Sequence, residues 1–261
     1  TGEVSLLSYS RRIMMVPVGV VAQAAGVASF PFLASLFVKN DMQSFCQTMH
    51  SAIKNTLILV LPVTFYMIAA AKPVLGLIFE GGQFGAEETV LAAPYLQIMM
   101  IAVPFWCVQQ ILGRSFYAME NTVTPALVGS MITVFIIPFY FYCAPRFGAV
   151  SVAFLTSASV IAYTLTLWFA GRKYFQRAYR GILCLLLKNV LCNGIPFFLC
   201  LAGGYCSELF LQGKIPLLWV QLAQIGFAGL VYLISYLIVA KYFMPENITL
   251  LISPFLRRLK R

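Results

Sequence analysis

The chain has 261 residues, of which 61% are hydrophobic and only 10% are charged, and its mean hydropathy is +0.88. This is more apolar surface than a soluble core of that size can hide, so the composition excludes an ordinary water-soluble domain and indicates a membrane protein. The formal net charge is +10, but the basic residues sit in short segments between apolar runs, which argues against nucleic acid and favours membrane lipids with anionic headgroups as partners.

Seven apolar runs are long enough to cross a bilayer, which takes about 20 residues. They lie at residues 4–37, 51–71, 86–118, 123–143, 148–171, 182–206 and 215–240. The runs are uniformly apolar and about twice as long as a membrane β-strand requires. The sequence therefore predicts an all-α fold, a polytopic membrane helix bundle of about seven transmembrane helices.

The first run contains two adjacent arginines, Arg11 and Arg12. If the helix begins near Gly2, Arg12 lies about 15 Å along it, which is about half the thickness of the hydrocarbon core. The guanidinium groups either snorkel to the interface or line a polar cavity, and the depth favours the cavity. Arginine suits bidentate binding of phosphate, so we predict that Arg12 and Arg11 bind an anionic substrate.

Five further residues are candidates for helix breaks that permit conformational change. They are Pro17, Gly19 and Pro31 in the first run, and Pro94 and Pro104 in the third. Proline removes a backbone donor and permits a bend, and interrupted helices are common in transporters whose bundles rock against each other. A kink that only improves packing is an equally open interpretation.

The distribution of Lys and Arg predicts the orientation. The richer set of loops holds Lys39, Lys54, Arg114, Arg172, Lys173, Arg177, Arg180, Lys188, Lys241, Arg257, Arg258, Lys260 and Arg261, and the alternate loops hold only Lys72, Arg146 and Lys214. By the positive-inside rule the first set is cytoplasmic, which places the C-terminus inside and Thr1 outside. Because the chain starts outside and begins with Thr rather than Met, we expect a further part of the protein upstream.

Catalytic and metal-binding chemistry has no support in the residue types. The seven cysteines are scattered without a CxxC pair, the only histidine is His50, and the eight acidic residues lie mostly in loops. No nucleophile elbow or Walker loop is present. We therefore expect no metal site, no cofactor and no enzymatic activity.

Three motifs resemble those of a known family. The segment Tyr9–Val20, running on to Phe30–Ser35, resembles the eighth transmembrane helix of MurJ/MviN-type lipid II flippases. The segment Leu77–Phe84 is similar to the family's LFERGAF loop and contributes Phe79, Glu80, Gly82 and Phe84. The segment Ser115–Pro125 is similar to the FYAxxDTxTP turn and contributes Phe116, Tyr117, Thr124 and Pro125. The motifs follow the family's order and spacing over nearly the whole chain.

The resemblance implies the C-terminal half of a fourteen-helix, two-lobe transporter of the multidrug/oligosaccharidyl-lipid/polysaccharide exporter superfamily. Such a protein flips the undecaprenyl-diphosphate-linked peptidoglycan precursor, lipid II, across the bacterial inner membrane by alternating access. Residues 1–178 would form five helices of the C-terminal lobe, and residues 179–261 would form two helices with a lipid-tail groove and a basic cytoplasmic tail. Arg12 matches the family's cavity arginine. Transport would need the N-terminal half of the same transporter as a partner.

Two positions depart from the family pattern. Members usually carry an acidic residue immediately before the cavity arginine, where this chain has Arg11, so the local charge changes sign. Members that use sodium place Asn or Asp on the helix equivalent to residues 123–143, and this run contains neither. The resemblance therefore implies a cationic cavity in this chain, but it does not imply a sodium site.

Three other interpretations remain open at the level of sequence. The chain could belong to a flippase or antiporter of the same superfamily with another cargo, such as an O-antigen unit or a drug. It could be a non-functional gene fragment. A seven-helix receptor or retinal protein shares the helix count, but a retinal pigment needs a lysine inside its last helix, and here Lys214 and Lys241 only flank the run 215–240.

Overall fold

The computed structural model describes residues 2–81, 84–211 and 217–244, and this part of the chain is an all-α helix bundle, as predicted. The elements are α1 (Gly2–Pro17), the π-helical segment η1 (Val18–Gln23), α2 (Ala24–Val38), α3 (Met42–Ala69), α4 (Ala71–Phe79), α5 (Ala86–Ala118), α6 (Val123–Tyr179), α7 (Ile182–Leu211) and α8 (Leu217–Phe243). The predictions for Thr1, Gly82 and the tail from Pro245 fall outside the described residues.

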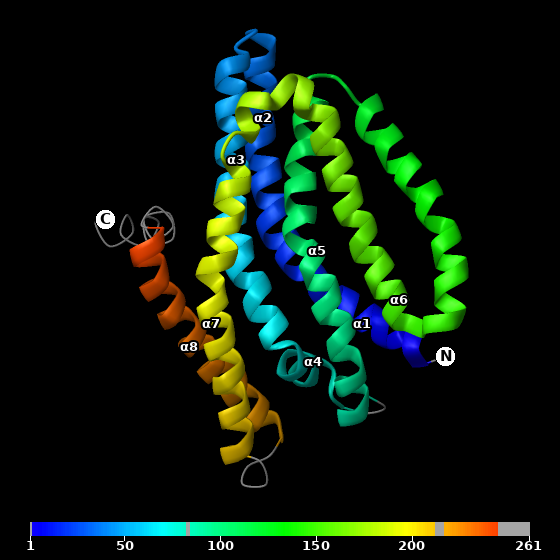
Figure 1. Ribbon diagram of the computed structural model, residues 1–261, viewed down its shortest axis with the longest axis vertical. Helices are drawn as coiled ribbons and strands as arrows, with labels where there is room; N and C mark the ends of the chain where they lie inside the picture. Colours follow the sequence, from blue (N-terminus) through cyan, green and yellow to red (C-terminus); the bar gives the residue numbers. More distant parts are fainter. Residues whose placement is uncertain (1, 82–83, 212–216, 245–261) are drawn as a thin grey trace.

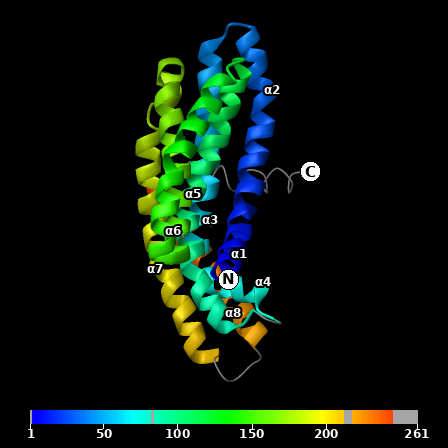
Figure 2. The same cartoon turned by 90° about the vertical axis from the view of Figure 1, so that its right-hand side faces the viewer.

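The long helices run alternately up and down and are spread side by side in Figure 1, while the turned view shows the narrower edge of the bundle (Figure 2). Six helices of the described residues are long and apolar enough to span a membrane. One of them, α6, has 57 residues, about twice the length that a single crossing needs. The ribbon of α6 descends, turns sharply and returns beside itself (Figure 1).

The turn in α6 is at Gly148, whose φ of 63° and ψ of −155° leave the helix. The two halves then pack antiparallel, since the hydroxyl of Tyr163 donates to the carbonyl of Pro125 at 3.0 Å and Tyr140 Oη lies 2.9 Å from Thr156 Oγ1. Counting α6 as two crossings raises the six spans to seven. The separate runs 123–143 and 148–171 are thereby confirmed.

A carboxylate from the start of the chain caps the return half of α6. The backbone N–H of Ala149 donates to Glu3 Oε2 at 3.1 Å. The first N–H groups of a helix have no intrahelical partner and carry a partial positive charge, so a carboxylate is a favourable acceptor there. The contact ties α1 to the corner of α6.

The first span is broken as the sequence suggested, but not at every proline. Directly after Pro17, which lacks an N–H, the chain forms the π-helical segment Val18–Gln23, which contains Gly19. Such π-segments inside α-helices are rare and frequent at functional sites. Helix α2 continues through Pro31, and α5 continues through Pro94 and Pro104, so any bending role of these three prolines stays a prediction.

Helix α5 is the centre of the bundle and packs against α1, α2, α3, α4 and α6. Its Leu96, Val103, Cys107 and Ile111 are fully buried. The outer surface is also apolar, as shown by Phe141, which is 80% exposed. An apolar exterior around an apolar core is the arrangement expected when lipid is the solvent.

Helices α7 and α8 pack mainly on each other, and residues of both form a small separate cluster of buried residues. The cluster comprises Cys200, Ala228, Tyr232, Tyr236 and Ala240. It joins the rest of the bundle through Tyr66 of α3, whose hydroxyl donates to the carbonyl of Ile225 at 2.9 Å and whose ring lies 5.7 Å from that of Tyr232. The pair is thus attached along α3 and α4.

We expect Gly148→Ala to lower the free energy of unfolding by about 1–3 kcal/mol, because only glycine adopts this backbone conformation without strain. A Cβ there would also lie 3.0 Å from Glu3 Oε2. The measurement is unfolding by SDS titration in mixed micelles. Gly194→Ala, inside α7 with open space around it, is the control and should not lower the free energy of unfolding. Equal loss in both variants would contradict the assignment of strain to the corner.

Candidate functional site

The outward side of the first span carries polar and charged residues between exposed valines. The buried side of the span carries Leu6, Ser10, Ile13, Met14, Val18 and Ala22, and its outward side carries Ser8, Arg11, Arg12, Gly19 and Gln23. Both predicted substrate-binding arginines are therefore on the outward side. We call the outward side, together with Arg114 described below, the cationic face.

An aromatic cluster lies next to Arg12 and contacts it through Tyr9. The Arg12 Cζ atom lies 5.9 Å from the centre of the Tyr9 ring, within the range of a cation–π contact. The Tyr9 ring in turn contacts Phe79 at 4.6 Å and Phe84 at 5.2 Å between ring centres. The predicted loop motif thus lies directly beside the predicted arginine.

The loop that carries Phe79 and Phe84 is a tight reversal. The N–H of Gly81 donates to the carbonyl of Phe84 at 2.9 Å, and the N–H of Phe84 donates back to Gly81 at 3.2 Å. Gly81 has a φ of 155°, which favours glycine. This reversal brings both phenylalanine rings to the same side, against Tyr9.

Glu80 in the same loop connects three helices. The amide of Gln221 in α8 donates to Glu80 Oε2, and the hydroxyl of Thr89 in the first turn of α5 lies 3.5 Å from Glu80 Oε1. Gln221 is almost fully buried. Glu80 therefore anchors the loop and does not face the arginines.

The third motif lies apart from Arg12. Phe116 is fully buried and meets the Phe175 ring edge-on at 5.3 Å, while Tyr117 is exposed. The N–H of Thr124 donates to Asn121 Oδ1 at 3.1 Å at the start of α6, and Pro125 accepts the bond from Tyr163. These residues shape the turn between α5 and α6.

The structure adds a cation that was not among the predicted site residues. Arg114 Nη2 donates to Gln23 Oε1 at 2.8 Å, across from α5 to η1. Its side chain lies over Gly26, where a Cβ would come within 2.7 Å of Arg114 Nε. The signal in the sequence was the pair Gln23 and Gly26, a polar and a small residue three positions apart in an apolar run.

The cationic face therefore presents three guanidinium groups, two from α1 and one that reaches η1 from α5. Gln23, which holds Arg114, lies 11 residues after Arg12, or about 16 Å along the helix. The only acidic residue in the first span is Glu3, at the N-terminal end of α1. Its Oε2 accepts a hydrogen bond from the N–H of Ala149. Such a face attracts phosphate or diphosphate, since guanidinium forks match phosphate oxygens. The described residues contain no group of three or more His, Cys, Asp or Glu that could hold a metal ion.

A bundle of seven apolar crossings with a cationic face on an interrupted span is the architecture of a helical membrane transporter. A family model described as "Lipid II flippase MurJ" matches residues 1–221. The chain belongs to this family, as the three motifs predicted.

Similar proteins agree with the family. The chain is 25% identical to "Lipid II flippase MurJ" of Thermosipho africanus over 168 residues, which are 64% of this chain and 34% of that protein. It is 25% identical to "Probable lipid II flippase MurJ" of Rhizobium tropici over 206 residues, which are 76% and 38% of the two chains. These matches cover less than half of each relative.

A solved structure has the same fold. It is titled "Lipid II flippase MurJ, inward closed conformation" and superposes with a TM-score of 0.69 at 24% identity. The match covers 92% of this chain and 48% of that one. The chain thus spans about half the length of its relatives, and its fold is that of a half-transporter.

We expect Phe84→Ala to lower the free energy of unfolding by about 3 kcal/mol, because it removes a buried ring from the cluster under Tyr9. Phe84 is 8% exposed. Phe32→Ala in α2, at a position 66% exposed, is the matched control and should change little. SDS titration in mixed micelles measures both, and comparable losses would show that the cluster adds no stability.

Proposed function

We propose that this chain takes part in flipping lipid II, the undecaprenyl-diphosphate-linked peptidoglycan precursor, across the bacterial inner membrane by alternating access. The cationic face is the observation that carries the proposal. A neutral cargo would not require arginines inside a span, where an uncompensated guanidinium is costly. A diphosphate supplies the charge that offsets this cost.

Arg12 is the proposed centre of headgroup binding, with Arg11 beside it. In a cavity of low dielectric, the attraction between a guanidinium group and a diphosphate is much stronger than in water. Arg11, at the position of the family's acid, adds a second positive charge there. The polyprenyl chain stays in an apolar environment throughout, so dehydration of the headgroup is the main barrier.

The proposal divides the chain into residues 1–178, the lobe with the cationic face, and residues 179–261, whose two helices provide a groove for the lipid tail. The separate buried cluster around Tyr232 supports this division. The chain covers about half of the solved relative. Transport therefore requires a second lobe that faces α1 and encloses the headgroup.

The same proposal assigns an orientation and a hinge. The distribution of Lys and Arg between alternate loops supports a cytoplasmic C-terminus. The π-helical segment after Pro17 is the proposed point of bending, because its hydrogen bonding already departs from the α-helical pattern. Gly19 in this segment has no neighbour within 4 Å of an added Cβ, which leaves room for movement.

We expect the chain, expressed with the second half of the transporter, to rescue growth of cells depleted of their own lipid II flippase. Arg12→Ala should abolish rescue, because the diphosphate loses its main partner. Arg146→Ala is the matched control, since Arg146 also lies over a tyrosine ring, at 3.9 Å, but on α6 and outside the cationic face.

The outcomes separate the alternatives. Rescue by the parent chain and by Arg12→Ala would remove Arg12 from the mechanism and leave the cargo unchanged. Absence of rescue by the parent chain, with normal amounts in the membrane, would indicate another cargo or an inactive gene product. Immunoblots of the membrane fraction supply the amounts.

A second prediction concerns Arg114. Gly26→Ala should displace the Arg114 side chain from Gln23 and reduce rescue, while the free energy of unfolding stays within about 1 kcal/mol because the displaced group is a flexible side chain. Gly113→Ala, next to Arg114 but with open space around it, should rescue normally. Equal growth of the two variants would show that Arg114 has no part in transport.

A further inference from the structure

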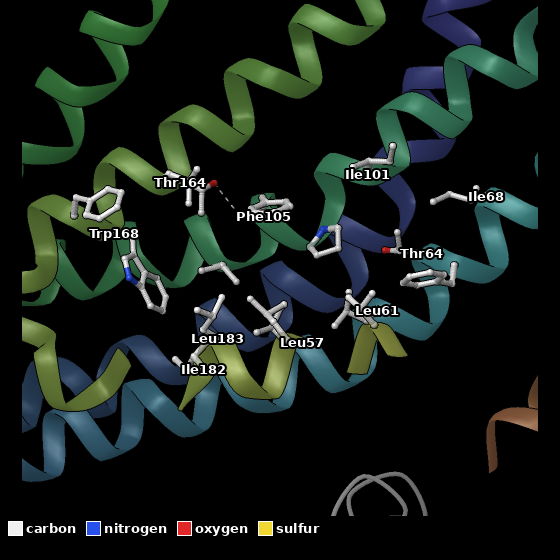
Figure 3. Close-up of a pocket in the computed structure, with 17 residues that line it drawn as sticks. Leu57, Leu61, Thr64, Ile68, Ile101, Phe105, Thr164, Trp168, Ile182 and Leu183 are labelled. Carbon is white, nitrogen blue, oxygen red and sulfur yellow. Dashed lines mark hydrogen bonds between the residues drawn. The ribbon is translucent and has the colours of Figure 1, made fainter. Parts of the chain in front are cut away.

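An apolar slot opens on the outer surface of the bundle, away from the cationic face. It lies between α3, α5, the return half of α6 and the start of α7, and its volume is about 450 Å³. Its lining includes Leu57, Leu61, Ile101, Phe105, Trp168 and Leu183 (Figure 3). The hydroxyl of Thr164 is turned away onto the carbonyl of Phe105 at 3.1 Å, so it does not make the slot polar.

The slot is open to the bilayer along its length. Ile101 is 53% exposed and Leu183 is 70% exposed, although both line it. On α3 the lining extends from Leu57 to Ile68, which is about 16 Å of helix. A single extended hydrocarbon chain fits these dimensions and can enter sideways.

One end of the slot is strongly basic. Trp168, Phe169 and Leu183 also line a second hollow, of about 530 Å³, to which Arg172, Arg177 and Arg180 contribute. Arg177 and Arg180 in turn line a third hollow, of about 730 Å³, with the polar residues Gln43, Gln47, His50 and Ser51 of α3. The described residues that line these two hollows include no acid.

The basic end is held in place by contacts of the elbow between α6 and α7. The rings of Trp168 and Tyr179 stack with centres 3.7 Å apart, and Gly171 leaves space for the Tyr179 hydroxyl, which a Cβ would meet at 2.4 Å. His50 Nδ1 lies 2.7 Å from the carbonyl of Ala178. The arginines are therefore carried on a segment fixed against α3, and the reversal at Gly181, with a φ of 83°, starts α7.

We infer that the slot and the hollows form one binding site for an anionic phospholipid of the bilayer. One acyl chain occupies the slot, and the phosphodiester headgroup is bound by Arg177 and Arg180 with Arg172 nearby. Charge complementarity selects this occupant, because arginines at a membrane interface attract anionic headgroups and an apolar slot holds a hydrocarbon chain. A zwitterionic lipid can also place an acyl chain in the slot, but its headgroup, which has no net charge, is attracted less strongly by the arginines.

The site shares only Tyr179, Arg180 and the first turns of α7 with the unit proposed to hold the lipid tail. No described residue of α8 lines the slot or the two hollows. Arg11, Arg12 and Arg114 are likewise not among their lining residues. The inference does not depend on the cargo, and it is tested by lipid binding without transport.

The test is lipid binding by the full chain, purified in detergent and measured by native mass spectrometry with added phosphatidylglycerol or phosphatidylcholine. We expect the parent chain to bind phosphatidylglycerol more tightly than phosphatidylcholine. In the double variant R177Q/R180Q the ratio of the two affinities should fall about tenfold. The double variant K173Q/K188Q is the control, because it removes the same charge from exposed residues nearby that line neither hollow.

A separate substitution tests whether the slot holds the acyl chain. Ile101→Trp should fill it and weaken binding of both lipids, while Leu191→Trp, on the exposed side of α7 and outside the slot, should have no effect. Equal binding of the two lipids by the parent chain would overturn the inference, as would equal loss in the two charge variants. Displacement of the lipid by inorganic phosphate would show that the arginines bind a free anion and not a lipid.

Discussion

Backbone hydrogen bonding in a medium without water is the constraint on which this structure depends. Every N–H and C=O within the bilayer must find a partner in the protein, so the chain is helical wherever it is surrounded by lipid. The departures from regular helix are few and each has a local compensation. At Gly148 the carboxylate of Glu3 accepts the N–H of Ala149, and after Pro17 the missing donor is followed by a π-helical segment. The first of these contacts connects distant parts of the chain, because it ties the corner of α6 to the start of α1.

The family-motif residues also affect a side chain that they do not touch. Phe79 and Phe84 contact Tyr9, and Tyr9 contacts Arg12, so the position of the guanidinium group depends on a loop about 70 residues further along the chain. Glu80 in the middle of that loop binds Gln221 of α8. The arginine is therefore coupled through one loop to the helix that the proposed function assigns to the lipid tail. Under the proposed function, this chain of contacts connects the helix for the lipid tail with the cation for the headgroup.

Sequence periodicity and length were sufficient for the fold, because a span in lipid must be long, apolar and helical. The run 86–118 coincides with α5, and the break between 143 and 148 coincides with the corner of α6. Helix α3 was predicted too short, since it begins at Met42 and not near Ser51, because its polar first turns extend beyond the apolar stretch that defines a span. The cationic face could be predicted in part: Arg11 and Arg12 stand out inside an apolar run, but the bond from Arg114 to Gln23 joins residues 91 positions apart. Such a pairing depends on how α5 packs against η1, which no local pattern specifies.

The two proposed anion sites use one residue type at different depths, and the depth decides what each can do. Arg177 and Arg180 lie on an exposed elbow, where a guanidinium group is hydrated in the absence of a lipid, so an empty site there costs the protein little. Arg12 lies well inside a span, where its charge is expensive whenever the cavity closes without an anion. Under the proposed function, a bound diphosphate removes that cost and an empty cavity does not. The ligand then has a different affinity for the open and closed states, which is the condition for it to shift the conformational equilibrium. In these two proposals, the arginines at the interface anchor the lobe, whereas the arginine inside the span makes closure depend on the cargo.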